Sequence, residues 1–190
     1  MARAGVTVER LARVAAELAD EVGFDNVTGS MVARRIGVKD ASLYAHVKNA
    51  RDLKARVAVL ALGELADRVA AAVAGRAGKD ALVAFGDAYR DYAKEHPGRW
   101  AATRFPLDAE LLAVSAAGRH AEMSRAILRG YDLAEPDQTD AVRLLGSVFL
   151  GYVSLETAGG FSHHPRAADD SWARALDALD AALRNWPAAS

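Results

Sequence analysis

Apolar residues recur at spacings of three and four along most of the chain, which is the period of an α-helix, and the alternation typical of strands is missing. The first such segment follows Thr7, a favourable N-cap residue, and stops at Gly23, where glycine can end a helix. About nine helices are predicted, over residues 7–22, 28–36, 40–46, 50–74, 79–95, 99–104, 108–131, 136–158 and 169–185. The sequence therefore predicts an all-α protein.

Residues 28–47 have the pattern of a helix-turn-helix. Such a motif needs a small residue where its two helices touch, a glycine where the chain turns, and apolar residues that dock the second helix on the first. Ala33 is the small residue, and Gly37 lies at the turn, where it can adopt the positive φ that other residues adopt at a cost. Val38 and Leu43 are the docking residues.

The last two helices carry patterns stronger than simple amphipathicity. In 169–185 and directly after it, large apolar residues follow the spacing of an a/d seam, which packs against partner helices; they are Trp172, Leu176, Leu179, Leu183 and Trp186. In 136–158 a stripe of small residues would let another helix approach closely; it consists of Ser147, Gly151, Ser154 and Ala158. Both stripes predict a homodimer bundle built from these two helices of each subunit. The alternative is that both serve only the core of a single chain.

Charge is distributed unevenly along the chain. The formal net charge is -1, which by itself argues against a nucleic-acid partner, but residues 1–56 carry ten Lys and Arg against seven Asp and Glu. Within residues 30–56 two acidic residues accompany seven basic ones, namely Arg34, Arg35, Lys39, Lys48, Arg51, Lys54 and Arg56. A local basic cluster of this kind is what a phosphate backbone attracts, although it is also typical of a solvated protein face.

Composition narrows the setting of the protein. Hydrophobic residues make up 52% of the chain, which is ample for a buried core, and there is no cysteine for disulfides or thiolate metal sites. The N-terminus lacks the apolar core of a signal peptide, and no apolar run approaches the roughly 18 residues of a membrane span. We expect a cytoplasmic protein without a membrane partner.

The chain resembles the tetracycline-repressor (TetR) family of transcriptional regulators over roughly residues 7–60. The resemblance rests on Gly23-Phe24, on Thr28, and on the runs ARRIGV at 33–38 and LYAHVKN at 43–49 followed by Leu53. It implies a DNA-binding domain at residues 1–52 and a ligand-binding and dimerisation domain at residues 53–190. The segment GYVSLETAGGF at 151–161 is similar to a Trp-His-Gly type of C-terminal domain in that family, from which it departs because Leu150 precedes Gly151.

The resemblance places the third helix in the major groove of DNA. The candidate DNA-binding residues are Thr28, Ser30, Lys39, Asp40, Ala41, Ser42, Tyr44, His46 and Lys48. Tyr44 and Lys48 suit phosphate contacts, whereas Ser42 and His46 suit base edges. Asp40 is more favourable as a helix cap than as a contact, because phosphates repel a carboxylate. The alternatives are a core aromatic for Tyr44 and a plain surface residue for His46.

The same resemblance implies a small-molecule effector. Large side chains in the C-terminal part predict a small, largely apolar ligand; they are Tyr89, Tyr92, Trp100, Phe105, Met123, Ile127, Phe149 and Tyr152, with Glu156 as a polar anchor. Each could instead be an ordinary core residue, and Glu156 a surface or interface carboxylate. His163-His164 is an unfavourable metal site because adjacent histidines lack a helical ligand spacing, so no metal or cofactor is predicted.

These observations predict a ligand-responsive repressor that binds a palindromic double-stranded DNA operator as a homodimer and is released by its effector. The competing classes are a small helical enzyme and a helical protein-binding adaptor. The enzyme class lacks support because the sequence has no G-x-S-x-G elbow, no H-E-x-x-H motif and no phosphate-cradling glycine loop. The adaptor would leave LYAHVKN unexplained.

Overall fold

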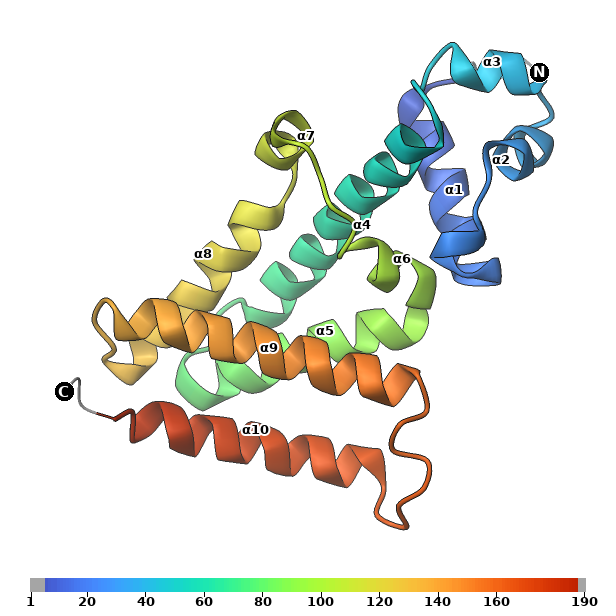
Figure 1. Ribbon diagram of the computed structural model, residues 1–190. Coiled ribbons are helices and arrows are strands. Elements are labelled where there is room, and N and C mark those ends of the chain that lie inside the picture. Colours follow the sequence, from blue (N-terminus) through green and yellow to red (C-terminus); the bar gives the residue numbers. More distant parts are fainter. Residues whose placement is uncertain (1–5, 188–190) are drawn as a thin grey trace. The chain divides into compact units, whose positions relative to one another are not determined.

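A computed structural model describes residues 6–187, which form ten α-helices and two short 3₁₀ helices without a strand (Figure 1). The predicted all-α class is confirmed. In chain order the elements are α1 (Val8–Val22), η1 (Phe24–Asn26), α2 (Gly29–Ile36), α3 (Asp40–Tyr44), α4 (Ala50–Val73), α5 (Gly78–Glu95), α6 (Pro97–Ala102), α7 (Ala109–Val114), α8 (Ala117–Leu128), η2 (Arg129–Tyr131), α9 (Asp137–Thr157) and α10 (Ala168–Arg184). None of these helices is long and apolar enough to cross a membrane.

The helix predicted over residues 108–131 is interrupted in the structure, which explains the additional helix. Asp108 caps α7 as expected, but the chain leaves the helix at Ser115, which has φ -80° and ψ 165°. The Ser115 hydroxyl donates to the carbonyl of Leu112 at 2.8 Å and accepts from the amide of Ala117 at 3.3 Å. Serine thus offers the backbone an alternative to the helical hydrogen bonds, and α8 begins two residues later.

The helices belong to two compact units, each with its own interior. The first consists of Met1–Glu64 and Glu95–Ala117, and the second of Leu65–Lys94 and Gly118–Ser190. The first unit therefore holds α1, α2 and α3 together with α6 and α7, and the long helix α4 contributes residues to both units.

In the first unit, α6 packs closely against the C-terminal end of α1. A Cβ atom added to Gly98 would lie 2.0 Å from both the carbonyl carbon and the carbonyl oxygen of Ala19, so the two helices approach too closely for any other residue. Beside this contact, Asp20 accepts hydrogen bonds from the amide of Arg99 at 2.9 Å and pairs with the Arg99 Nε at 3.1 Å. Nδ1 of His96 lies 3.2 Å from the same carboxylate.

The second unit has α9 and α10 side by side and antiparallel (Figure 1). Its interior is aromatic, since Phe85 packs on Phe149 with ring centroids 5.7 Å apart and Phe149 packs on Trp172 at 5.9 Å. The indole N–H of Trp172 donates to Asp87 at 2.7 Å, so the buried ring retains a hydrogen-bond partner.

An ion network centred on the buried Arg90 joins three helices of the second unit. Arg90 of α5, only 7% exposed, donates to Glu156 of α9 at 2.7 Å and to Asp169 of α10 at 2.6 Å. The guanidinium of Arg90 also lies 5.5 Å from the ring centroid of Trp172. Hydrogen bonds from Arg90 hold the pKa of Glu156 below its ordinary value. Glu156, predicted as a polar anchor for a ligand, is thus engaged by Arg90 within the fold.

Candidate DNA-binding interface and effector region

The turn between α2 and α3 has the backbone geometry predicted for it. Gly37 adopts a left-handed conformation, with φ 80° and ψ 36°, and its amide donates to the carbonyl of Ala33 at 3.0 Å. The amide of Val38 donates to the same carbonyl at 2.9 Å, which completes the helix end. Ala33 is fully buried, as the small residue between two touching helices must be. At the other end of α2, the hydroxyl of Thr28 accepts from the amide of Met31 at 3.3 Å.

The helix α3 is shorter than predicted but presents the expected residues. It ends at Tyr44, whereas the pattern placed the end at His46, because the amide of His46 donates to the carbonyl of Leu43 in a tight turn. Leu43 is fully buried and docks α3. All nine candidate DNA-binding residues are exposed.

Asp40 does not cap α3 through a hydrogen bond, which corrects the prediction for this residue. It is the first residue of α3, and Lys39 occupies the N-cap position without a side-chain hydrogen bond. The Asp40 carboxylate instead accepts from the hydroxyl of Ser30 at 2.5 Å. This contact joins the start of α2 to the start of α3, and it lowers the number of hydroxyls available to a phosphate by one.

Tyr44 reaches back from α3 to the start of α2. A Cβ added to Gly29 would lie 2.7 Å from the Tyr44 hydroxyl, so glycine leaves room for the phenol there. Tyr44 is 46% exposed, which argues against a core aromatic. Its hydroxyl thus lies at the N-terminus of α2, where helical amides favour an anion.

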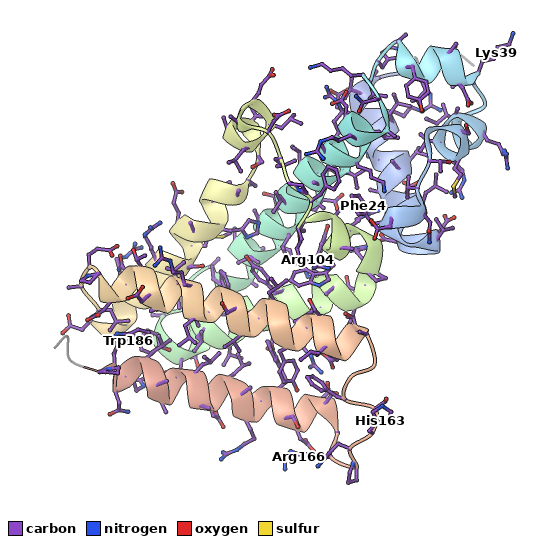
Figure 2. All side chains as sticks on the ribbon, viewed as in Figure 1. Phe24, Lys39, Arg104, His163, Arg166 and Trp186 are labelled. Carbon is purple, nitrogen blue, oxygen red and sulfur yellow. The ribbon has the colours of Figure 1, made fainter. Side chains whose placement is uncertain are left out.

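Only some of the seven clustered cations are available to DNA. Four are engaged within the fold: Arg35 pairs with Glu21 at 2.6 Å, Arg56 pairs with Asp52 at 3.1 Å, Lys54 donates to the carbonyl of Asp25 at 3.0 Å, and Arg51 lies over Phe105 at 5.3 Å. Arg34, Lys39 and Lys48 have no ion pair with any residue in 6–187, and Figure 2 shows Lys39 projecting outward beside α3. These three cations define the basic part of the surface.

Lys48→Ala is expected to weaken DNA binding on all sequences alike and to lower the slope of log affinity against log salt by about 1, because one phosphate contact is lost. The backbone at this position is fixed, since the Lys48 amide donates to Asp52 at 2.8 Å. Arg35→Ala is the matched control and is expected to leave the slope unchanged, because Glu21 already neutralises Arg35. Gel-shift titrations at several salt concentrations measure both, and a sequence-selective loss in Lys48→Ala would contradict the assignment.

Ser42→Ala and His46→Ala are expected to change the preferred operator rather than the general affinity. Both side chains are exposed on or just after α3, and hydrogen bonds to base edges contribute about 1–3 kcal/mol of discrimination. Selection from a random duplex library with each variant measures the preference. An unchanged preferred sequence in both variants would remove these residues from the base-reading set.

The nine predicted effector residues are not gathered around one cavity. Trp100 and Phe105 belong to the first unit, where Phe105 packs edge-on against Phe24. The other seven belong to the second unit, and of these Tyr92 and Phe149 are buried in its core.

Three of the predicted effector residues line cavities of the second unit. Met123 and Ile127 line one cavity of about 360 Å³, and Tyr152 lines another of about 420 Å³. Tyr89 is half-buried beside His120, with its hydroxyl 2.6 Å from Nδ1, and desolvation raises the pKa of Tyr89. Most of the other residues that line the cavity beside Tyr152 come from the loop between α9 and α10, and the sequence did not predict them as ligand-binding residues.

The predicted dimer residues divide into two groups. Those of α10 are buried inside the chain itself, which corrects the prediction that they contact a second subunit; they are Trp172, Leu176, Leu179 and Leu183. On α9, Ser147, Gly151 and Ala158 are exposed and Ser154 is half-buried. Leucines are exposed on the same helix, at Leu144, Leu150 and Leu155.

Comparison with known proteins supports the assignment of α2 and α3 as the candidate DNA-binding interface. Residues 11–56 match the family described as bacterial regulatory proteins, tetR family, and residues 82–179 match the tetracyclin repressor-like C-terminal domain. An uncharacterized HTH-type transcriptional regulator of Mycobacterium tuberculosis is 35% identical over 142 residues. That match covers 74% of this chain and 65% of the relative, so the chain spans less than two thirds of the relative's length.

Solved structures share the fold. A protein of unknown function from Rhodococcus sp. RHA1 is similar with a TM-score of 0.76 and 18% identity, over 95% of this chain and 97% of that one. A TetR variant from Acinetobacter baumannii AYE, in complex with minocycline, is similar with a TM-score of 0.70 and 20% identity, over 94% of this chain and 97% of that one.

The turn, the exposed α3 surface and these matches define the class of protein as the helix-turn-helix transcriptional regulators. The chain belongs to the TetR family, whose members are DNA-binding regulators rather than enzymes.

Proposed function

We propose that the chain is a repressor that binds a palindromic operator as a homodimer and is released by a small-molecule effector. Residues 1–52 would be the DNA-binding domain, and residues 53–190 the ligand-binding and dimerisation domain. The observation that carries the proposal is the surface of α2 and α3: the Tyr44 hydroxyl lies at the start of α2, Ser42 is exposed on α3, and His46 and the unpaired Lys48 are exposed just after α3.

The homodimer is proposed to form through the exposed face of α9. Gly151 lies on this face, and a Cβ added there meets no atom within 4 Å. The exposed leucines at Leu144 and Leu155 flank it with apolar surface. Such a strip on an otherwise polar exterior is typical of a helix that packs against a second subunit.

Gly151→Arg is expected to fold normally and to halve the particle mass in light scattering, because a charged side chain would be buried in the dimer but is accommodated by the single chain. Gly118→Arg is the control, since Gly118 of α8 also has open space around its Cβ position and lies away from α9. An unchanged mass for Gly151→Arg would contradict the proposed interface.

Release is proposed to act through α4, which begins at Ala50, two residues after Lys48, and runs without a break to Val73. Two half-sites must lie about 34–36 Å apart to be gripped by one dimer, so a small displacement of α4 is sufficient to separate the recognition helices from them. The relative bound to minocycline supports a small-molecule effector, proposed here to be largely apolar.

Selection of bound fragments from genomic DNA with the purified protein tests the proposed function. The expected result is a small set of promoter fragments that share a palindrome, and the adjacent genes indicate candidate effectors. Addition of the correct effector should then release the fragments. Enrichment of no fragment over the input would contradict DNA binding and favour a protein-binding adaptor.

A further inference from the structure

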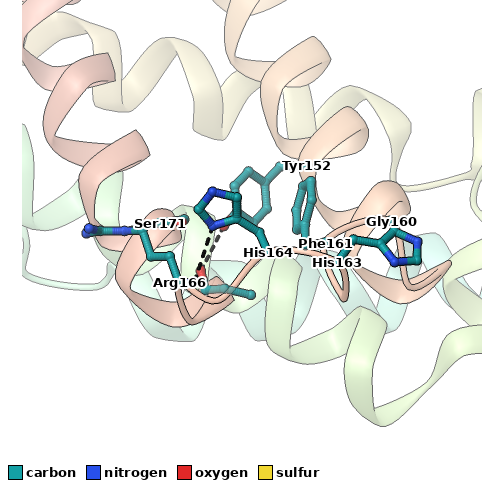
Figure 3. A pocket seen from close by; sticks show the side chains of 8 residues that line it. Tyr152, Gly160, Phe161, His163, His164, Arg166 and Ser171 are labelled. Atoms are coloured by element: carbon teal, nitrogen blue, oxygen red, sulfur yellow. Dashed lines mark hydrogen bonds between the residues drawn. The ribbon is translucent and has the colours of Figure 1, made fainter.

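A cavity of about 420 Å³ lies between the end of α9 and the start of α10, within the second unit. Its lining includes Tyr152 of α9, Phe161, His164 and Arg166 of the connecting loop, and Ser171 of α10 (Figure 3). A cavity of this size is within the range that small-molecule sites occupy.

One side of the cavity is aromatic. The rings of Tyr152 and Phe161 have centroids 4.8 Å apart and planes inclined at 59°, and Tyr152 packs on Trp172 at the same centroid distance. The Tyr152 hydroxyl donates to the carbonyl of Ala168 at 2.8 Å, which fixes the ring against the start of α10. A fixed pair of aromatic rings favours a flat apolar group beside it.

The remaining side chains are cationic or hydrogen-bond donors. Arg166 has a single side-chain contact among residues 6–187, to the backbone carbonyl of Asp170 at 3.5 Å, and it has no carboxylate partner there. His164 accepts from the amide of Arg166 through Nδ1 at 3.2 Å, so the neutral ring carries its proton on Nε2 as a donor. Figure 3 shows the His164 ring next to Tyr152, on the side of the cavity where Arg166 lies.

The cavity lining contains no acidic side chain. The nearby Asp169 is engaged elsewhere, because Arg90 binds its carboxylate at 2.6 Å. The residue before α10, Ala167, supplies no side-chain cap for the first amides of this 17-residue helix. The cavity thus combines a positive charge, hydrogen-bond donors and an aromatic wall. No carboxylate in its lining neutralises the positive charge of Arg166.

We propose that this cavity binds a flat aromatic molecule that carries one carboxylate, with its ring against Tyr152 and Phe161 and its carboxylate at Arg166. A guanidinium binds a carboxylate through paired, charge-assisted hydrogen bonds, and an unpaired guanidinium beside aromatic rings selects both parts of such a ligand. The proposal rests on the ligand-binding role in the proposed function and deepens it, because it names the chemistry of a ligand and its place in the second unit; its test does not depend on DNA.

Isothermal titration of the intact protein with 2-naphthoate and with 2-naphthamide tests the proposal. The two probes have nearly the same shape and differ in charge. The expected result is one naphthoate bound per chain and at least about tenfold weaker binding of the amide, since hydrogen bonds to charged groups are the stronger ones. Equal affinity for both probes, or no binding of naphthoate, would overturn the proposal.

Variants then locate the site. Arg166→Gln is expected to weaken naphthoate binding about tenfold and to leave naphthamide unchanged, whereas Phe161→Ala should weaken both. Arg174→Gln, on the exposed face of α10, is the control and should change neither. Arg166 is exposed, so its replacement should leave thermal unfolding unchanged. Unaltered naphthoate affinity in Arg166→Gln would place the ligand elsewhere and overturn the proposal, whatever the outcome of the DNA experiments.

Discussion

Gly98→Ala is expected to lower the free energy of unfolding by about 3 kcal/mol or more, the largest effect of any single methyl group in the first unit. The added Cβ would lie 2.0 Å from the carbonyl group of Ala19 and 2.5 Å from the amide of Asp20. Backbone atoms inside α1 cannot rotate away as a side chain can, so α6 must separate from α1. DNA binding should be lost in parallel, because α1 supports the helix-turn-helix.

Gly63→Ala is the matched control for this prediction. Gly63 lies in the middle of α4, and a Cβ there meets no atom within 4 Å. Because alanine favours a helix over glycine, this variant should be neutral or more stable by about 0.5–1 kcal/mol. Urea unfolding of both variants gives the comparison. A Gly98→Ala protein as stable as the parent would show that α6 does not pack on α1 in this way.

Arg90→Met is expected to destabilise the second unit by about 1–3 kcal/mol, because it removes the guanidinium that donates two hydrogen bonds to Glu156 and leaves only Lys94, whose Nζ lies 3.4 Å from the carboxylate, as a cationic partner. The double variant Arg90→Met with Glu156→Leu should recover much of that loss, since replacing a whole buried ion pair by apolar groups is often neutral. Arg174→Ala, which breaks an exposed pair with Asp177, is the control and should leave stability unchanged. Equal stability of Arg90→Met and the parent would contradict the network.

The same pair predicts a dependence on pH. Arg90 lowers the pKa of Glu156 from its ordinary value of 4.5, so the contribution of the pair is complete above about that pH. It is lost as pH falls below 4.5 and through the folded-state pKa of Glu156, because protonation removes the charge that Arg90 binds. The free energy of unfolding of the double variant, measured by urea unfolding, should therefore fall less than that of the parent as the pH is lowered through 4.5.

Local signals were sufficient for much of the fold. The helices follow apolar periodicity, and the turn follows from Gly37, whose positive φ few other residues tolerate. The break at Ser115 was missed because serine is also common inside helices, and its bonds to neighbouring backbone groups depend on the fold. The early end of α3 at Tyr44 likewise lies in a short helix with little periodicity.

The sites depend on contacts between residues far apart in the sequence, and the sequence alone does not reveal these contacts. The a/d seam of α10 was recognised, but the pattern is the same whether the partner helix belongs to the same chain or to a second one, and the structure buries Leu176 and Leu183 within the chain. Glu156 looked available to a ligand because nothing local indicates Arg90, which lies 66 residues away in the sequence. The basic cluster was visible, yet only the fold shows that Glu21 neutralises Arg35 and leaves Lys48 unpaired.

The most direct test of the account is an anisotropy titration of a labelled duplex that carries the selected sequence, with excess unrelated duplex present and the salt concentration raised in steps. The expected result is saturation at two chains per duplex, with a salt slope that falls by about 1 in Lys48→Ala and is unchanged in Arg35→Ala. Binding no tighter than to a scrambled duplex, or an identical salt slope in all three proteins, would contradict the claim that α2 and α3 form the DNA-binding surface.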